Sequence, residues 1–91
     1  MMRRVRATVY GRVQGVNFRS HTARLARALG LTGWVRNRED GAVELEGEGA
    51  VPLVEEFLGS LRIGPPAARV DRVEILEIDP VSDSEEFSIR R

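Results

Sequence analysis

The order in which two kinds of hydrophobic periodicity follow one another constrains the fold of this chain most. Segments that alternate apolar and polar residues predict strands, and apolar residues three or four positions apart predict helices. The predicted elements are a strand at Val5–Tyr10, a helix at Phe18–Leu29, strands at Thr32–Arg38 and Val43–Glu46, a helix that begins at Pro52, and a strand at Val70–Asp79. This βαββαβ order predicts the ferredoxin-like fold, an α+β sandwich whose mostly antiparallel sheet carries two helices on one face.

Turn-forming residues mark the ends of these elements. Gly30 stands where a left-handed helix C-cap belongs, and Asp40-Gly41 is a strong hairpin signal. Gly64-Pro65-Pro66 ends the second helix, whose stripe of apolar residues is Val54, Phe57, Leu58 and Leu61. The pattern also predicts that the strand from Val43 is broken at Gly47–Gly49, that the last long strand has a bulge between Ile75 and Leu76, and that Phe87–Ile89 forms a short edge strand.

The composition excludes several classes of protein. The 91 residues, of which 42% are hydrophobic, suffice for one globular domain that spans residues 1–91. The absence of cysteine excludes disulfides and thiolate chemistry, and the single histidine, His21, argues against a histidine-ligated metal, so no metal or cofactor is expected. The apolar runs are too short for a membrane span or a signal-peptide core, so we expect a cytoplasmic protein with no membrane partner.

Charge is divided between the two halves of the chain, although the net charge is zero. Nine arginines and no acid precede Glu39, whereas five arginines and all fourteen acids lie from Glu39 onward, which gives net charges of +9 and −9. All fourteen basic residues are arginine, whose planar guanidinium suits bidentate binding of phosphate or carboxylate, although genomic base composition also explains the absence of lysine. The division predicts that an anion is drawn to the N-terminal half. Glu44, Glu46 and Glu48 alternate along a strand and predict a solvated face.

The segment Gly11–Arg19 is the strongest candidate for a functional site. It joins a strand to the start of a helix, contains Gly15, and ends with Arg19 at the helix entrance. The backbone amides of such a loop and the helix dipole can bind an anion, to which Arg19 can add a charged donor. The segment lacks the Lys-Ser/Thr of a phosphate-binding P-loop and the spacing of a dinucleotide-binding fingerprint. The loop alone therefore predicts an oxyanion site, with a purely structural turn as the alternative.

The same segment resembles the first signature of the acylphosphatase family, in the residues Gly11-Arg12-Val13-Gln14-Gly15-Val16 followed by Phe18-Arg19. Gly33-Trp34-Val35-Arg36-Asn37, Asp40-Gly41 and Val43-Glu44 resemble the second signature, and Phe57-Leu58, Gly64-Pro65-Pro66 and Ala68-Arg69-Val70 fit the C-terminal half of the family. The resemblance covers nearly the whole chain, with both motifs in the family's order.

The resemblance implies an enzyme that hydrolyses the carboxyl–phosphate bond of a small acyl phosphate to a carboxylate and inorganic phosphate, without a metal or a covalent intermediate. It implies that the main-chain amides of Gln14, Gly15, Val16, Asn17, Phe18 and Arg19 bind the phosphoryl group, that Arg19 is the phosphate-binding arginine, and that Asn37 orients the attacking water. It also implies a monomer, since the family is usually monomeric. A carboxylate is a good leaving group, so we expect no strong general acid and infer that the phosphoryl oxygens accept the water proton.

Asn17 departs from the family pattern, which tends to have glycine or a bulky apolar or aromatic residue at this position. Asparagine tolerates left-handed backbone geometry, so we expect the loop to form and its substrate preference or rate to be affected.

Two other classes of function stay open. Ferredoxin-like sheets also bind RNA, although aromatic residues are only 5% of this chain and the usual aromatic motif is absent, so no nucleic-acid partner is expected. A non-catalytic anion-binding domain is the second alternative, since acylphosphatase-like domains also occur in larger hydrogenase-maturation proteins.

Overall fold

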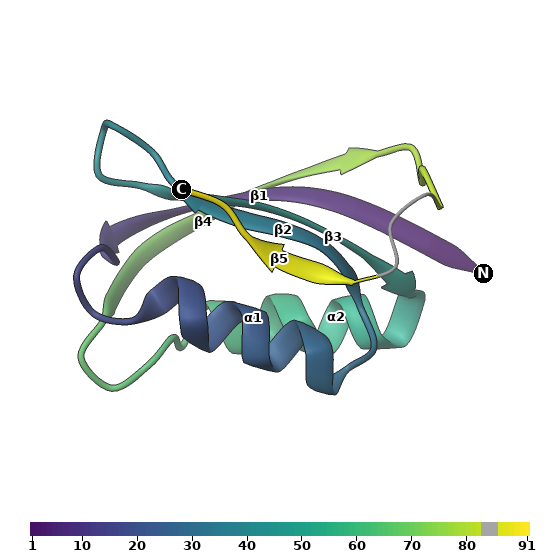
Figure 1. Ribbon diagram of the computed structural model, residues 1–91, viewed down its shortest axis with the longest axis horizontal. Coiled ribbons are helices and arrows are strands. Elements are labelled where there is room, and N and C mark those ends of the chain that lie inside the picture. Colours follow the sequence, from purple (N-terminus) through teal and green to yellow (C-terminus); the bar gives the residue numbers. More distant parts are fainter. Residues whose placement is uncertain (83–85) are drawn as a thin grey trace.

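The fold follows the predicted order of elements, including the short edge strand at Phe87–Ile89. The computed structural model describes residues 1–82 and 86–91. The elements are β1 (Met2–Arg12), α1 (Phe18–Ala28), β2 (Thr32–Asn37), β3 (Val43–Ala50), α2 (Val51–Leu61), β4 (Arg69–Ile78) and β5 (Phe87–Ile89). Both helices lie side by side on one face of the sheet, and the other face is open (Figure 1). The predicted ferredoxin-like α+β sandwich is therefore confirmed. Within the described residues, no helix is long and apolar enough to cross a membrane.

The sheet has five strands in the order β4-β1-β3-β2-β5. The pairs β1–β3, β1–β4 and β2–β3 are antiparallel, whereas the predicted edge strand β5 pairs parallel with β2. Strands β1 and β3 are central, so most sheet contacts join segments far apart in the chain. The sheet thereby brings the end of β2 close to the loop that follows β1.

Strand β3 does not stop at Gly47, as the glycine pattern predicted, but continues to Ala50. Its two glycines are places where the covering elements come close to the sheet. A Cβ atom on Gly47 would lie 3.2 Å from the ring of Phe57, and one on Gly49 would lie 2.3 Å from the side chain of Leu31. The glycines are thus a packing requirement and not a break in the strand.

The irregularity between β1 and β4 lies at the other end of the strand from the predicted position. Ile75 and Leu76 pair regularly with Ala7 and Arg6, and the register shifts between Tyr10 and Gly11. Gly11 has φ 134°, and a Cβ atom there would lie 2.1 Å from the carbonyl oxygen of Arg69. The bulge prediction was therefore wrong, because close approach of the two backbones, and not the two adjacent apolar residues, sets the register shift.

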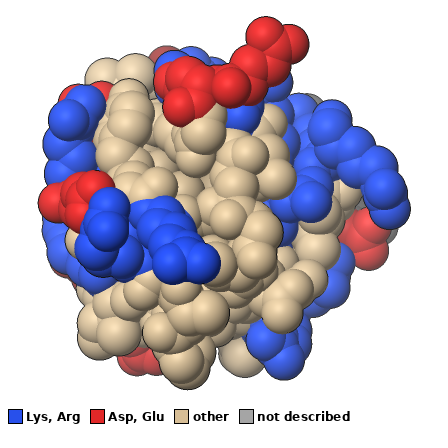
Figure 2. Space-filling model, turned by 90° about the vertical axis from the view of Figure 1, so that its left-hand side faces the viewer, with Lys and Arg blue, Asp and Glu red and all other residues tan. Residues whose placement is uncertain are grey.

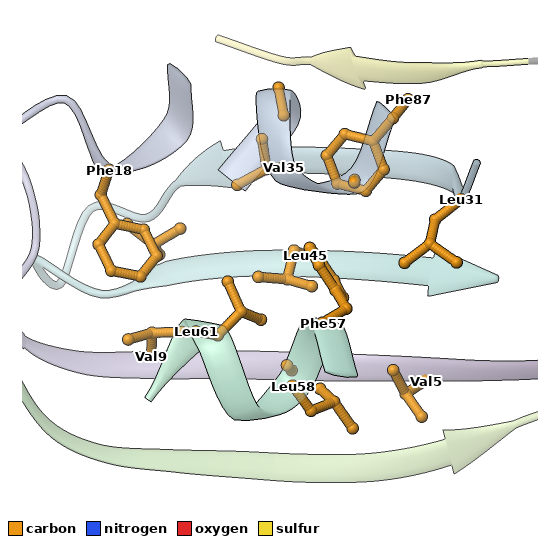
Figure 3. Packing of buried hydrophobic residues seen from close by; sticks show 14 of the residues in the cluster. Val5, Val9, Phe18, Leu31, Val35, Leu45, Phe57, Leu58, Leu61 and Phe87 are labelled. Carbon is orange, nitrogen blue, oxygen red and sulfur yellow. The ribbon is translucent and has the colours of Figure 1, made fainter. Parts of the chain in front are cut away.

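The core lies between the helices and the inward face of the sheet (Figure 3). Its largest fully buried side chains include three phenylalanines that come from the start of α1, from α2 and from β5: Phe18, Phe57 and Phe87. The rings of Phe57 and Phe87 are 6.0 Å apart and meet edge to face. Phe18 directly follows the loop between β1 and α1 and is buried, so the first turn of α1 is anchored in the core.

The open face of the sheet joins the two oppositely charged halves of the chain. Arg4 bonds to both Glu46 and Glu48, at 2.8 and 3.2 Å, and Arg6 bonds to Glu46 at 2.5 Å. Glu46 is 8% exposed and Glu48 1%, so the predicted solvated glutamate face is wrong at these two positions. The alternating pattern could not reveal that the neighbouring strand carries arginines in register.

Ion pairs with acidic residues compensate many of the arginines in the N-terminal half, which the division of charge along the sequence did not predict. Arg3 pairs with Glu55 of α2 and Glu77 of β4, and on the sheet and its hairpin Arg36 pairs with Glu44 and Arg38 with Asp40. No ion pair joins an acidic side chain of the described residues to Arg12, Arg19, Arg24, Arg27, Arg90 or Arg91. Apart from Arg62 at the end of α2, the arginines that lack an ion pair with a described residue therefore lie at the end of β1, on α1 and after β5, and not over the whole N-terminal half.

Candidate functional site

Three segments that are distant in the sequence meet at one end of the molecule. They are the loop between β1 and α1, the hairpin between β2 and β3, and the chain after β5, all on the left in Figure 1. The predicted phosphate-binding loop and Asn37 both lie at this end, which is therefore the candidate site.

The loop turns sharply through left-handed backbone geometry before α1 begins. Gly15 has φ 75°, and Asn17 has φ 63° and ψ 26° at the N-cap position of the helix. Asn17 thus adopts the left-handed conformation that its residue type was expected to tolerate. Its side chain makes no capping hydrogen bond, although its carbonyl accepts the amide of His21 at 3.0 Å.

The amides of this turn are not used by the fold. From residue 14 to residue 20, no backbone amide donates a hydrogen bond to another described residue. Three of them, at residues 18–20, belong to the first turn of α1, where the helix dipole is positive. Successive free amides at a helix N-terminus are the arrangement that binds an oxyanion.

A pocket of about 390 Å³ opens beside these amides. Its walls come from the loop, the first turn of α1, the end of β2 and the chain around β5: Val13, Gly15, Asn17, Phe18, Arg19, Ser20, Asn37, Ile89 and Arg91. Arg19 and Asn37, the two candidates from different motifs, therefore line one cavity. Among the residues that the structure describes, the charged side chains in its walls are Arg19 and Arg91, so these walls are cationic.

The position of Arg19 is set by the C-terminal segment. Its Nη1 donates to the carbonyl oxygen of Arg90 at 3.1 Å, and the amide of Arg90 in turn donates to Val35 at 2.8 Å. Arg27, two turns further along α1, donates to the carbonyl oxygen of Phe87 at 2.8 and 3.0 Å. Because the acceptor of Arg19 is a neutral carbonyl oxygen, this hydrogen bond orients the guanidinium without compensating its positive charge.

Gln14 contributes to the site differently from the rest of the loop. Its side chain does not line the pocket but donates from Nε2 to the carbonyl oxygens of Arg38 and Ala42, at 2.7 and 3.0 Å. The loop is thereby tied to the hairpin that follows Asn37. Val16 packs against the core and does not line the pocket either.

The hairpin is stabilised by Asp40. The amide of Ala42 donates to this carboxylate at 3.1 Å and, together with the guanidinium of Arg38, keeps the pKa of Asp40 below its usual range. Gly41 completes the turn with φ 94°. Asn37, the last residue of β2, pairs with Val43 and has a side-chain amide that bonds to none of the described residues. That amide is free to bind a ligand or a water molecule.

Sequence reasoning missed three residues of the pocket. Ser20 and Ile89 are there because of the α1–β5 packing, and Arg91 because the chain after β5 turns toward the loop. Of these residues, the sequence pattern predicted only that Ile89 belongs to an edge strand at Phe87–Ile89. It did not predict that this strand pairs with β2. His21 in α1 is half-buried, and burial together with the charge of Arg24 lowers its pKa.

The arrangement suits binding of a phosphoryl or carboxylate group by amides and a guanidinium. Among the described residues, no cluster of three or more histidine, cysteine or acidic side chains could hold a metal ion. Figure 2, which looks onto this end of the molecule, shows arginine side chains around a largely uncharged central surface.

Comparison with known proteins agrees with the motifs. The family model described as Acylphosphatase matches residues 5–89. A protein named acylphosphatase from Salinibacter ruber is 46% identical over 98% of this chain and 94% of its own length, and one from Anaeromyxobacter dehalogenans is 51% identical over 96% and 94%. The crystal structure of an acylphosphatase from Bacillus subtilis superposes with a TM-score of 0.94 at 35% identity, and the match covers both chains completely.

Proposed function

Because this chain belongs to the acylphosphatase family and is an acylphosphatase, we propose that the pocket between the loop and the end of β2 is its active site. In this proposal the free amides of the loop and the first turn of α1, together with Arg19, bind the phosphoryl group. Asn37 orients the water that attacks phosphorus. The substrate is a small-molecule acyl phosphate.

One observation carries this assignment. Arg19 and Asn37 come from different motifs, and both line the single pocket that also borders the unbonded amides. A guanidinium and several amides are the donors that the charged equatorial oxygens of a transferring phosphoryl group require. A neutral side-chain amide such as that of Asn37 accepts one hydrogen bond from water while its NH2 group stays available.

The bonds made and broken balance without any further group. The oxygen of water forms a bond to phosphorus, and the bond between phosphorus and the bridging oxygen breaks. The bridging oxygen leaves with the electron pair as part of a carboxylate. One proton of the attacking water passes to a phosphoryl oxygen, and the other stays on the oxygen that is now bonded to phosphorus. Catalysis then depends on positioning and on charge stabilisation.

The test is hydrolysis of benzoyl phosphate, with and without a chelator, by the wild type and two variants. Arg19→Gln and Asn37→Ala are expected to lower kcat/KM by about 10²-fold or more, as for the loss of other groups that stabilise a transition state. Arg12→Gln is the matched control, because Arg12 is exposed near the loop but does not line the pocket. Circular dichroism establishes that each variant is folded.

Each result has a clear meaning. Chelator-resistant turnover that both variants lose, and that Arg12→Gln keeps, supports the assignment. A wild type that binds phosphate through Arg19 but does not hydrolyse the substrate would leave an anion-binding domain. A titration with single-stranded RNA at physiological salt tests the remaining alternative, and no binding is expected.

We also propose that the protein acts as a cytoplasmic monomer with one domain over residues 1–91. The composition and the single continuous core support this proposal. Sedimentation at several protein concentrations tests it, and a mass that rises with concentration would contradict it.

A further inference from the structure

The active-site pocket continues along α1 into a second cavity. This cavity, of about 410 Å³, is lined by Asn17, Ser20, Arg24, Arg27 and Ile89. Three of these residues, Asn17, Ser20 and Ile89, also line the first pocket. The two cavities are therefore neighbouring parts of one depression between α1 and β5.

The residues from α1 share one face of the helix. Ser20, Arg24 and Arg27 are four and three positions apart, which is the spacing of neighbours on a helical face. Each residue adds about 1.5 Å along the axis, so Arg24 lies about 6 Å beyond Ser20. Arg24 and Arg27 are thus about one and two turns beyond Ser20, which borders the active-site pocket.

The charge of this second cavity is uncompensated. Arg24 is exposed and bonds to none of the described residues, and the acceptor of Arg27 is the neutral carbonyl of Phe87. Among residues 1–82 and 86–91, no acidic side chain lines the cavity. Of the described charged side chains, those that line the cavity would all attract an anionic group placed there.

Other depressions next to the active site differ in this respect. The one at the β2–β3 hairpin is lined by Glu39 and Asp40 as well as by arginines, and the one over Trp34 includes Glu44. Both would repel a second anion more than the cavity on α1 does. The direction along α1 is therefore the favourable one for a substrate that carries two negative groups.

We propose that Arg24, flanked by Arg27, binds an anionic group on the acyl part of the substrate, so that this enzyme prefers acyl phosphates whose acyl group itself carries a carboxylate or a phosphoryl group. The proposal rests on the proposed function, because the first pocket must hold the reacting phosphoryl group. Arg24 then determines specificity without contacting the reacting atoms.

The test compares two rigid substrates of the same shape. 4-Carboxybenzoyl phosphate carries a carboxylate, whereas 4-carbamoylbenzoyl phosphate carries a neutral amide of nearly the same size and shape, and their difference in intrinsic reactivity cancels when the ratio is compared between variants. The readout is the ratio of kcat/KM for the carboxylate substrate to kcat/KM for the amide substrate. The 3-substituted pair repeats the comparison with the anionic group at another angle.

The matched variants are Arg24→Gln and Arg62→Gln. Both remove one exposed arginine that bonds to none of the described residues, but Arg62, at the end of α2, lines neither cavity. Arg24→Gln is expected to lower the ratio about fivefold, the size expected for a partly exposed charge pair, whereas Arg62→Gln leaves it unchanged. The wild-type ratio should fall in 0.5 M salt because screening weakens exposed ion pairs, and Arg24→Lys should keep most of it.

The outcomes separate the two proposals. If the wild type hydrolyses the amide substrate but the ratio is the same in wild type and Arg24→Gln, or falls equally in both variants, the anionic subsite is wrong and the active site stands. If the wild type hydrolyses neither substrate, the proposed function fails and the subsite fails with it.

Discussion

The hydrogen bonds of Gln14 make a quantitative prediction about how the phosphate loop is held. The side-chain NH2 group donates to the carbonyl oxygens of Arg38 and Ala42, and so joins the loop to the hairpin next to Asn37. Gln14→Glu keeps the shape of the side chain but replaces the donor by a carboxylate. At neutral pH the two carbonyl oxygens would then face a negative charge.

The expected cost follows from the two bonds that are lost. Each contributes a net stabilisation of about 1 kcal/mol, so the free energy of unfolding should fall by about 2 kcal/mol at pH 8. The carbonyl oxygens favour the protonated acid, which can donate to one of them, so the pKa of the introduced carboxyl group rises in the folded state. Stability is then highest below the unfolded-state pKa of about 4.3 and is lost as the pH rises through the folded-state pKa.

The assay is urea unfolding at several pH values, followed by circular dichroism. Gln14→Leu is the control, because it lacks the donor at every pH. The stability difference between the Glu and Leu variants should therefore depend on pH and favour the Glu variant in acid. A Gln14→Glu variant as stable as the wild type at pH 8, or a difference from the Leu variant that does not change with pH, would refute the reasoning.

Three further predictions concern Glu48 on the open face of the sheet and two residues of α1. Burial would raise the pKa of Glu48, but the Val81 amide, Arg4 and Ser82 together lower it, so this carboxylate stabilises the fold above its unfolded pKa and loses that effect as the pH falls. Glu48→Gln should thus cost about 3 kcal/mol at pH 7 and flatten the acid limb of a urea-stability profile. His21 has a lowered pKa, so the folded state favours its neutral form and loses stability as the pH falls through about 6.5; His21→Gln should remove that dependence between pH 5 and 8. The Thr22 hydroxyl is buried and bonds to none of the described residues, so Thr22→Val should raise the unfolding free energy by about 1 kcal/mol, and an unchanged or lower Tm would contradict this.

Local patterns predicted most of the fold because the elements end at residues with strong conformational preferences. Gly30 and Gly41 both adopt positive φ, at 71° and 94°, where the sequence placed a helix cap and a hairpin. The start of α1 at Phe18 followed from the same logic, since the loop before it contains Gly15 and Asn17, both left-handed.

Properties that depend on partners across the sheet could not be predicted in this way. Alternation along β3 says which face Glu46 and Glu48 share, but not that Arg4 and Arg6 of β1 lie opposite them in register. The sequence of β3 also does not reveal that Phe57 and Leu31 pack closely against this strand. Gly47 and Gly49 therefore resemble a break in the strand, although they make room for these side chains.

In the candidate site, too, local features could be predicted and long-range contacts could not. The loop and Arg19 could be found from one stretch of sequence, whereas the placement of Asn37 beside them was an expectation taken from a second motif. Long-range packing places Ile89 and Arg91 in the walls of the pocket. It also places the cavity that Arg24 lines beside this pocket, because the two have lining residues in common.

The central claim is that the pocket positions water for attack at phosphorus. Hydrolysis of benzoyl phosphate in ¹⁸O-labelled water, with mass analysis of both products, tests it most directly. The account predicts that the label enters inorganic phosphate and that benzoate stays unlabelled, because the bond between phosphorus and the bridging oxygen breaks. Label in benzoate would mean attack at the carbonyl carbon and would contradict the account.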